Sequence, residues 1–330
     1  MKTEEKVLRI GTAAIVFAVV LRLFAGGLYD KLTGWLVSDE LTSILLYAGT
    51  GKVFRPVSPP ETAAPTEPPA EPEVPTEPEM EPATFSAEDA VYVSLTNHAG
   101  YSFDTEQLLQ SPLSWDLTGD EPTVLILHSH ACESYENTEG YTPSAYYRTT
   151  DTNYNMVSVG TYLAQCLEEK GIRVIHDTAL HDGVSYNDAY KNSRAATKAY
   201  LEQYPSIRLV LDIHRDAYED GKGNQASNTL TVNGQKSARL MIVSGTDAFG
   251  EDHSNWSENL STALKLQATL EKLYPGLCRP LSVRSSAFNQ DLSPGALLIE
   301  VGTAGDERQA ALQAAALLAD GIAALAAGSQ

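Results

Sequence analysis

The sequence predicts an α/β fold in which a mostly parallel sheet has helices on both faces. Three observations support this prediction. From about residue 120 onward, short apolar runs alternate with segments of helical periodicity. The apolar runs are nearly continuous, as in strands that are buried on both faces. Histidines follow or end two of the runs, and ligands of open α/β sheets gather at the carboxyl ends of strands.

The first elements form two strand–helix steps. Residues 123–128 (TVLILH) are an apolar run suited to a buried strand. Residues 153–170 place their apolar side chains on one helical face, and Gly171 follows as a C-cap. Residues 172–175 predict the next strand, and residues 187–204 predict a second helix.

A hairpin is expected in the second half of the chain. Residues 229–232 and 239–244 have strand character and flank Asn233-Gly234, a dipeptide typical of tight hairpin turns. The other elements are a strand, a long helix and a last buried strand before an Ala-rich helix closes the chain: residues 207–213, 254–274 and 296–301.

The N-terminus predicts a membrane anchor. Residues 11–29 (GTAAIVFAVVLRLFAGGLY) carry one charge, Arg22, and match the roughly 20 residues that cross a bilayer. Three basic residues precede this segment and only Lys31 follows closely, so we expect a cytoplasmic N-terminus and an outward-facing body. The apolar run is long for a cleaved signal peptide. Residues 1–33 are therefore expected to anchor a single-pass protein in the cell membrane.

The remaining organisation follows from composition. Residues 34–55 have no assigned role. Residues 56–85 are expected to form a disordered Pro/Glu-rich spacer, since residues 56–82 hold ten of the 17 prolines. Residues 86–330 are expected to form one extracytoplasmic catalytic domain with its core at 120–330.

Charge and cysteine content exclude some classes of protein. The formal net charge is −20, and residues 56–147 contain 17 Asp and Glu but no Lys or Arg. A nucleic-acid binder needs a basic face, so we expect no nucleic-acid partner. Three cysteines leave one over in any pairing, which argues against a disulfide framework, and the absence of a C-x-x-C pair argues against a thiolate zinc site.

Two histidines and a glutamate form the main candidate for a metal site. His130 follows the first strand in LILHSHACESY, His214 ends the third in LVLDIHRDA, and Glu133 lies three residues after His130. Two imidazoles and one carboxylate can hold zinc and leave a position for water. Asp151, in the loop before the first helix, is an alternative third ligand.

Glu300 and Cys132 are the candidates for direct chemistry. Glu300 is a charge inside the apolar strand LLIEVG, where a carboxylate is costly unless it is paired or near a metal. It could move the protons that a zinc hydrolase requires. Cys132 beside His130 raises the possibility of a thiol nucleophile, although a small buried cysteine is the simpler interpretation. His128 and His176 are interpreted as structural residues or as supports behind the ligands.

A series of motifs between about residues 120 and 305 resembles the stage II sporulation protein P family of cell-wall amidases. In order, the motifs are LILHSHACESY, YNMVSVGTYLAQCLEEKGIRVIHD, SYNDAYKNS, LVLDIHRDA, NWSENLSTALKL, YPGLCRPL and FNQDLSPGALLIEVG. The resemblance implies a zinc amidase fold, zinc as cofactor and peptidoglycan as substrate. It matches His130 and His214 to the zinc histidines, Glu133 to the remaining ligand and Glu300 to the catalytic glutamate.

The resemblance has further implications. The family usually has threonines where this chain has Ser129, Ala131 and Cys132, which weakens the case for a cysteine nucleophile. The family is also associated with cross-link endopeptidase activity. It acts at the engulfing septum of sporulating cells with a lytic transglycosylase and a second membrane protein, which would be partners of this chain.

The expected function is therefore a membrane-anchored zinc amidase that cleaves the bond between N-acetylmuramic acid and L-alanine. Arg215 could bind a stem-peptide carboxylate, and Asn289 and Gln290 could donate hydrogen bonds to the substrate. Two alternatives stay open. A zinc carboxypeptidase would use a similar set of residues to trim stem peptides, and a non-catalytic protein would bind the wall without cleaving it.

Overall fold

The computed structural model describes residues 85–327, apart from positions 114, 115, 137, 139, 145, 220 and 223. The anchor predicted at residues 11–29, the segment 34–55 and nearly all of the spacer lie outside the described residues. Within the described part, one helix, Arg308–Ala327, is long and apolar enough to cross a membrane, but 72% of its most apolar window is buried inside the protein. Burial of this kind is typical of a core helix.

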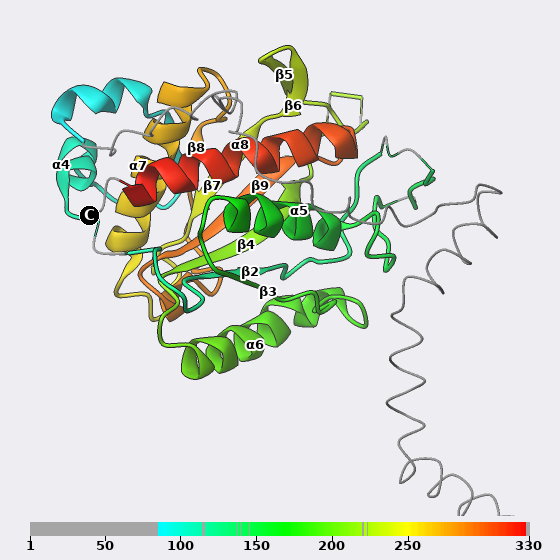
Figure 1. The fold of residues 1–330 in the computed structure, drawn as a ribbon, viewed down its shortest axis with the longest axis horizontal. Coiled ribbons are helices and arrows are strands. Elements are labelled where there is room, and N and C mark those ends of the chain that lie inside the picture. Colours follow the sequence, from blue (N-terminus) through cyan, green and yellow to red (C-terminus); the bar gives the residue numbers. More distant parts are fainter. Residues whose placement is uncertain are drawn as a thin grey trace, which may run out of the picture. The chain divides into compact units, whose positions relative to one another are not determined.

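A seven-stranded sheet forms the centre of the described region (Figure 1). All neighbouring strands are parallel except β7 and β9, so two parallel blocks run in opposite directions. This arrangement confirms the predicted α/β fold with a mostly parallel sheet. The strands, in spatial order, are β1 (Leu95–Asn97), β8 (Leu281–Val283), β7 (Leu240–Ser244), β9 (Ala296–Thr303), β4 (Leu209–Asp216), β2 (Val124–Leu127) and β3 (Val174–His176).

Helices cover both faces of this sheet. Figure 1 shows α5 (Met156–Glu169), α7 (Trp256–Leu273) and α8 (Arg308–Ala327) over one face and α6 (Ala189–Gln203) below the other. Shorter elements complete the described chain: η1 (Ala87–Tyr92), α4 (Thr105–Gln110), η2 (Tyr186–Asp188) and η3 (Gln290–Leu292).

The alternation of side chains along β4 decides which residues meet which helices. Leu209, Leu211 and Ile213 pack into the large core beneath α5, α7 and α8, whereas Val210 packs with Tyr200 and its neighbours on the α6 side. Because successive side chains point to opposite faces, Asp212 and His214 continue the α6 side. The carboxyl end of β4 therefore presents polar side chains on that face.

The expected hairpin turn is confirmed, but its second strand was wrong. Asn233 and Gly234 have φ angles of 50° and 79°, as a tight hairpin turn requires. β5 (Thr229–Val232) pairs across this turn with β6 (Gln235–Ala238), while residues 240–244 form β7 of the main sheet. A two-residue turn pairs the residues that flank it directly, and the polar sequence QKSA carries no apolar strand signal.

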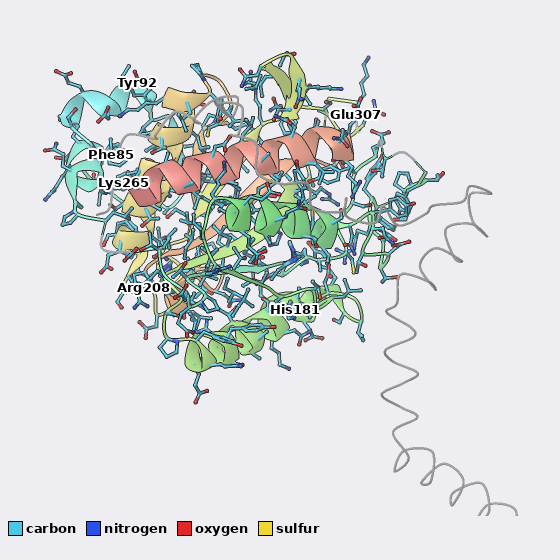
Figure 2. The ribbon with its side chains drawn as sticks, viewed as in Figure 1. Phe85, Tyr92, His181, Arg208, Lys265 and Glu307 are labelled. Atoms are coloured by element: carbon cyan, nitrogen blue, oxygen red, sulfur yellow. The ribbon has the colours of Figure 1, made fainter. Side chains whose placement is uncertain are left out.

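The segment before β2 packs against α7. Lys265 on this helix donates a hydrogen bond from Nζ to the Leu108 carbonyl (2.7 Å), near the end of α4. Its Nζ atom also lies 6.0 Å from the centre of the Phe85 ring, and Figure 2 shows both residues at the same end of the molecule. Gln267 bonds the backbone of Ser94 in both directions. Residues 86–110 are thus an integral part of the same domain as the sheet.

Candidate active site

His130 lies in the turn that follows β2. Its ring is buried, stacks on Tyr186 with the ring centres 4.2 Å apart, and faces the edge of Tyr190. The ring of His214 lies 5.5 Å away, centre to centre. β2 and β4 are direct neighbours in the sheet, so their carboxyl ends bring together the two histidines expected from the sequence.

Glu133 reaches His214 from the same turn. Its Oε2 atom lies 3.6 Å from Nδ1 of His214 and accepts a hydrogen bond from the backbone N–H of Arg215 (3.2 Å). Burial would raise the pKa of Glu133, but the Arg215 guanidinium and His214 hold it below its usual value. Glu133 is therefore a buried, ionised carboxylate next to an imidazole.

His214 lies between two carboxylates. Asp212, on the same face of β4, places Oδ1 2.8 Å from Nε2 of His214, and Glu133 lies on the Nδ1 side. Burial lowers the pKa of His214, but Asp212 and Glu133 together raise it well above its usual value. The surroundings of this imidazole favour positive charge.

Glu300 occupies the β9 position that pairs with His214 on β4. It is the one residue of β9 that is not fully buried, and its Oε2 atom has no hydrogen-bond partner. Burial raises the pKa of this carboxyl to about 8, and the negative charge of Glu133 contributes in the same direction. A carboxyl group with such a pKa can both accept and release a proton near neutral pH.

The donor atoms suit a zinc ion chemically. Glu300 Oε2 is a buried polar atom without a hydrogen-bond partner. Each imidazole has a buried carboxylate beside one ring nitrogen: Asp182 lies 3.6 Å from Nδ1 of His130, and Asp212 lies 2.8 Å from Nε2 of His214. Unpartnered buried polar atoms are costly, and a bound ion is one way to satisfy them. Among the described residues, no three His, Cys, Asp or Glu side chains lie close enough together to hold a metal ion as they stand. The fit to zinc therefore rests on the chemistry of the imidazole and carboxylate groups and on the unpartnered Oε2 atom of Glu300.

The structure separates the two candidates for the third ligand. Asp151 is exposed, and its Oδ1 atom accepts hydrogen bonds from the backbone (3.0 Å) and the side-chain amide (2.9 Å) of Asn153. Glu133, by contrast, contacts His214. The thiol of Cys132 is also a poor nucleophile here, since burial and Asp182 raise its pKa to about 12.

Arg215 connects the loop after β2 to the sheet. Its guanidinium is buried and donates hydrogen bonds from Nε to the Ser134 carbonyl and from Nη2 to the Tyr147 carbonyl, both at 3.0 Å. Nη1 lies 3.6 Å from Oε1 of Glu133. These contacts position the loop that carries Glu133. Carboxylate binding by Arg215 stays a prediction, and all of these partners lie within the chain.

Asn289 and Gln290 are likewise engaged inside the protein. Gln290 accepts a hydrogen bond from the backbone of Gly245 (2.8 Å) and donates one to the Val243 carbonyl (2.9 Å). Asn289 donates to the Tyr190 carbonyl (2.8 Å). Gln290 thus supports the end of β7 and Asn289 supports α6, and substrate binding by either residue stays a prediction.

His128 and His176 form a buried pair behind the site. His128 Nδ1 lies 2.8 Å from the Ile213 carbonyl and must donate to it, so its Nε2 accepts from Nε2 of His176 (2.9 Å). Burial lowers the pKa of His128 to about 3 and that of His176 to about 4. Both side chains are neutral, and His128 is bonded to the residue that precedes His214.

Two aspartates and two tyrosines at the site were not expected from the sequence. Asp182 lies 3.6 Å from Nδ1 of His130 and pairs with Arg148 at 2.6 Å. Asp212, described above, also accepts hydrogen bonds from the backbone and hydroxyl of Ser129. The alternation Asp-Ile-His on β4 is a signal that could have revealed Asp212. Asp182, Tyr186 and Tyr190 reach His130 from the single stretch that joins β3 to the first turn of α6, and no apolar run or strand end marks them in the sequence.

Comparisons with known proteins agree with the sequence motifs. The family model for Stage II sporulation protein P matches residues 57–323. The chain is 31% identical over 215 residues to Stage II sporulation protein P of Bacillus subtilis (strain 168), an alignment that covers 62% of this chain and 51% of that protein. The chain thus spans about half the length of this curated relative.

Solved structures with some similarity include N-acetylmuramoyl-L-alanine amidases. One from Clostridium difficile 630 is 18% identical, with a TM-score of 0.37, over 62% of this chain and 94% of that chain. One from Mycobacterium abscessus is 14% identical, with a TM-score of 0.37, over 63% of this chain and 97% of that chain. The family model covers most of the sequence, and on that match the chain belongs to the stage II sporulation protein P family.

Proposed function

We propose that this chain is a zinc-dependent peptidoglycan hydrolase that acts in sporulation and cleaves the amide bond between N-acetylmuramic acid and L-alanine. Family membership supports the substrate class. One structural observation carries the chemistry: Glu300 pairs with His214 across neighbouring strands, and Glu133 lies 3.6 Å from the same imidazole. This arrangement supports a role for Glu300 in proton transfer beside a candidate metal site.

His130, Glu133 and His214 would hold the zinc ion. When bound, zinc lowers the pKa of a water ligand to about 7 and polarises the scissile carbonyl. The chain's own residues prepare the ligands for this task. Asp212 and Asp182 lie against the two imidazoles, and Arg215 holds the backbone around Glu133. Outer contacts of this kind orient metal ligands and tune their basicity.

Glu300 would act as the proton shuttle. It accepts a proton from the attacking water and delivers one to the leaving amine of L-alanine. Its partial exposure leaves a path to the substrate, while its raised pKa of about 8 lies close to neutral pH. A carboxylate with these properties suits both halves of the proton transfer.

The remaining parts of the proposal concern location and partners. Residues 11–29 would anchor the protein in the cell membrane with the catalytic domain outside, and the Pro/Glu-rich spacer would separate the two. By family membership, the protein would act at the engulfing septum with a lytic transglycosylase and a second membrane protein. An additional endopeptidase activity on cross-links would use the same site.

Mass spectrometry of digested peptidoglycan tests the proposal. The full-length chain, supplied with zinc, should release stem peptides with free L-alanine amino termini from purified wall. His214→Ala should abolish the release. Loss of terminal D-alanine alone would instead indicate a carboxypeptidase. Wall that binds the protein but yields no product would indicate a binding protein, and either result would overturn the amidase assignment.

A further inference from the structure

A groove of about 330 Å³ opens beside the site, on the sheet beyond β9. Its lining includes a carboxylate from the end of β4, side chains from β7 and β8, and two arginines. These residues are Asp216, Met241, Ser282, Arg279 and Arg284.

Strand pairing places this groove next to the candidate active site. Met241 on β7 pairs directly with Glu300 on β9, so the two side chains lie next to each other on one face of the sheet. Glu300 in turn pairs with His214. Asp216, at the end of β4, contributes to the raised pKa of Glu300. A chain bound at Glu300 can therefore extend over Met241 into the groove.

The groove is locally basic although the protein has a formal net charge of −20. Arg279 pairs with Asp216 (2.7 Å) and lies 5.7 Å from the centre of the Tyr218 ring, so its position is fixed. Arg284 is exposed, and only its backbone has hydrogen-bond partners among the described residues: its N–H donates to the Ser244 carbonyl and its carbonyl accepts from Thr246. One guanidinium is thus neutralised and positioned, and the other is available.

We propose that this groove binds the stem peptide of the substrate and that Arg284 pairs with one of the free carboxylates of that peptide. The inference rests on the proposed function, because it assumes that the bond to be cleaved lies at Glu300. A guanidinium and a carboxylate form a bidentate, charge-assisted pair that fixes orientation as well as affinity. The groove would then favour glycan whose peptides have free carboxylates over glycan whose peptides have amidated carboxylates.

Equilibrium binding to the full-length chain tests the groove without requiring cleavage. The probes are a stem tripeptide with free carboxylates and the same peptide with every carboxylate amidated. Arg284→Gln should weaken binding of the free peptide about tenfold, as expected for the loss of one charge-assisted pair. Arg284→Glu should weaken it further. The amidated peptide should bind the wild type and Arg284→Gln equally weakly.

Arg173→Gln is the matched control, since Arg173 is also exposed but precedes β3 at the opposite edge of the sheet. This variant should bind the free peptide like the wild type. The proposal is overturned if the wild type fails to bind the peptide with free carboxylates, or if amidation of the peptide does not change its affinity. It is also overturned if Arg284→Gln and the control Arg173→Gln lose affinity equally. If the peptide binds in a manner that depends on Arg284 but the protein cleaves no peptidoglycan, the proposed function is refuted and the peptide-binding role of the groove is retained. If the protein cleaves peptidoglycan at a rate that changes neither with substitution of Arg284 nor with amidation of the peptide, the proposed function is retained and the role of the groove is refuted.

Discussion

His214 on β4 and Glu300 on β9 are paired in register on neighbouring parallel strands. They lie near the carboxyl ends of these strands, where the turn after β2 brings His130 and Glu133 close to His214. A candidate ligand and a candidate proton-transfer group are therefore fixed by strand pairing, which is more rigid than a loop. The loop-borne Glu133 is held by Arg215, which bonds the carbonyls of Ser134 and Tyr147.

Zinc content should separate the ligands from the other acidic residues. His130→Ala, Glu133→Ala and His214→Ala should each lower the zinc retained after dialysis sharply, because two remaining side chains cannot hold the ion. Asp151→Ala should retain zinc like the wild type, since Asp151 is exposed and bonded to Asn153. Elemental analysis of the four variants checks this. Normal zinc content in Glu133→Ala together with loss in Asp151→Ala would reverse the assignment.

Asp212→Asn should weaken zinc binding about 10- to 100-fold without unfolding the protein, as is typical when a residue behind a metal ligand is changed. The reason is that Asp212 lies 2.8 Å from Nε2 of His214 and orients the ring. A competition titration with a metal indicator gives the affinity. Asp188→Asn, on an exposed carboxylate at the start of α6, is the control and should leave the affinity unchanged. Equal affinities in Asp212→Asn and the wild type would contradict this role.

Much of the site could be predicted from the sequence because its chemistry sits at the ends of apolar strands. His130, His214 and Glu300 interrupt or follow such runs, where burying a polar side chain costs free energy unless the side chain is paired or binds a metal. The residues that surround them could not be found in this way. Asp182 and Tyr186 lie in the connection between β3 and α6, and they meet His130 only because the chain folds back there.

Some elements of the fold could be predicted from the sequence and others could not. Strands with long apolar runs, such as β2 and β4, were expected within a few residues of their observed bounds. The three-residue strands β1 and β8 were not expected, since three residues carry almost no periodicity. They form because the edge of the sheet offers them backbone partners: β8 pairs with β7, and β1 pairs with β8.

Gly160→Ala should destabilise the protein by about 1–3 kcal/mol, the usual cost of overpacking a well-packed interior. A Cβ atom at Gly160 would overlap His128 and lie 2.7 Å from Nε2 of His176. Helix propensity alone would make the same change stabilising, so the sign is diagnostic. Urea unfolding measures the effect. Gly221→Ala, where a Cβ atom meets open space, should be nearly neutral. A stabilised Gly160→Ala variant would show that the two histidines are not packed as described.

The free energy of unfolding should fall as the pH drops from about 6.5 to about 4, in part through His176. Burial lowers its pKa from 6.5 to about 4, so over this range the unfolded chain takes up a proton that the folded protein does not. His176→Gln removes this contribution and should give a shallower dependence. Urea unfolding at several pH values, in parallel for wild type and variant, provides the comparison. An equal or steeper slope in the variant would mean that His176 is not held neutral.

The most direct test of the central claim is zinc content measured beside the rate of L-alanine amino-terminus release by Glu300→Gln. This change keeps the shape of the side chain and removes the base, so the variant should retain zinc and lose cleavage by about 10²- to 10⁴-fold. Glu307→Gln, on a surface carboxylate that pairs with Lys236, should cleave at the normal rate. Loss of zinc in Glu300→Gln would place Glu300 among the ligands. A near-normal rate with zinc retained would contradict the assignment of Glu300 as the proton shuttle.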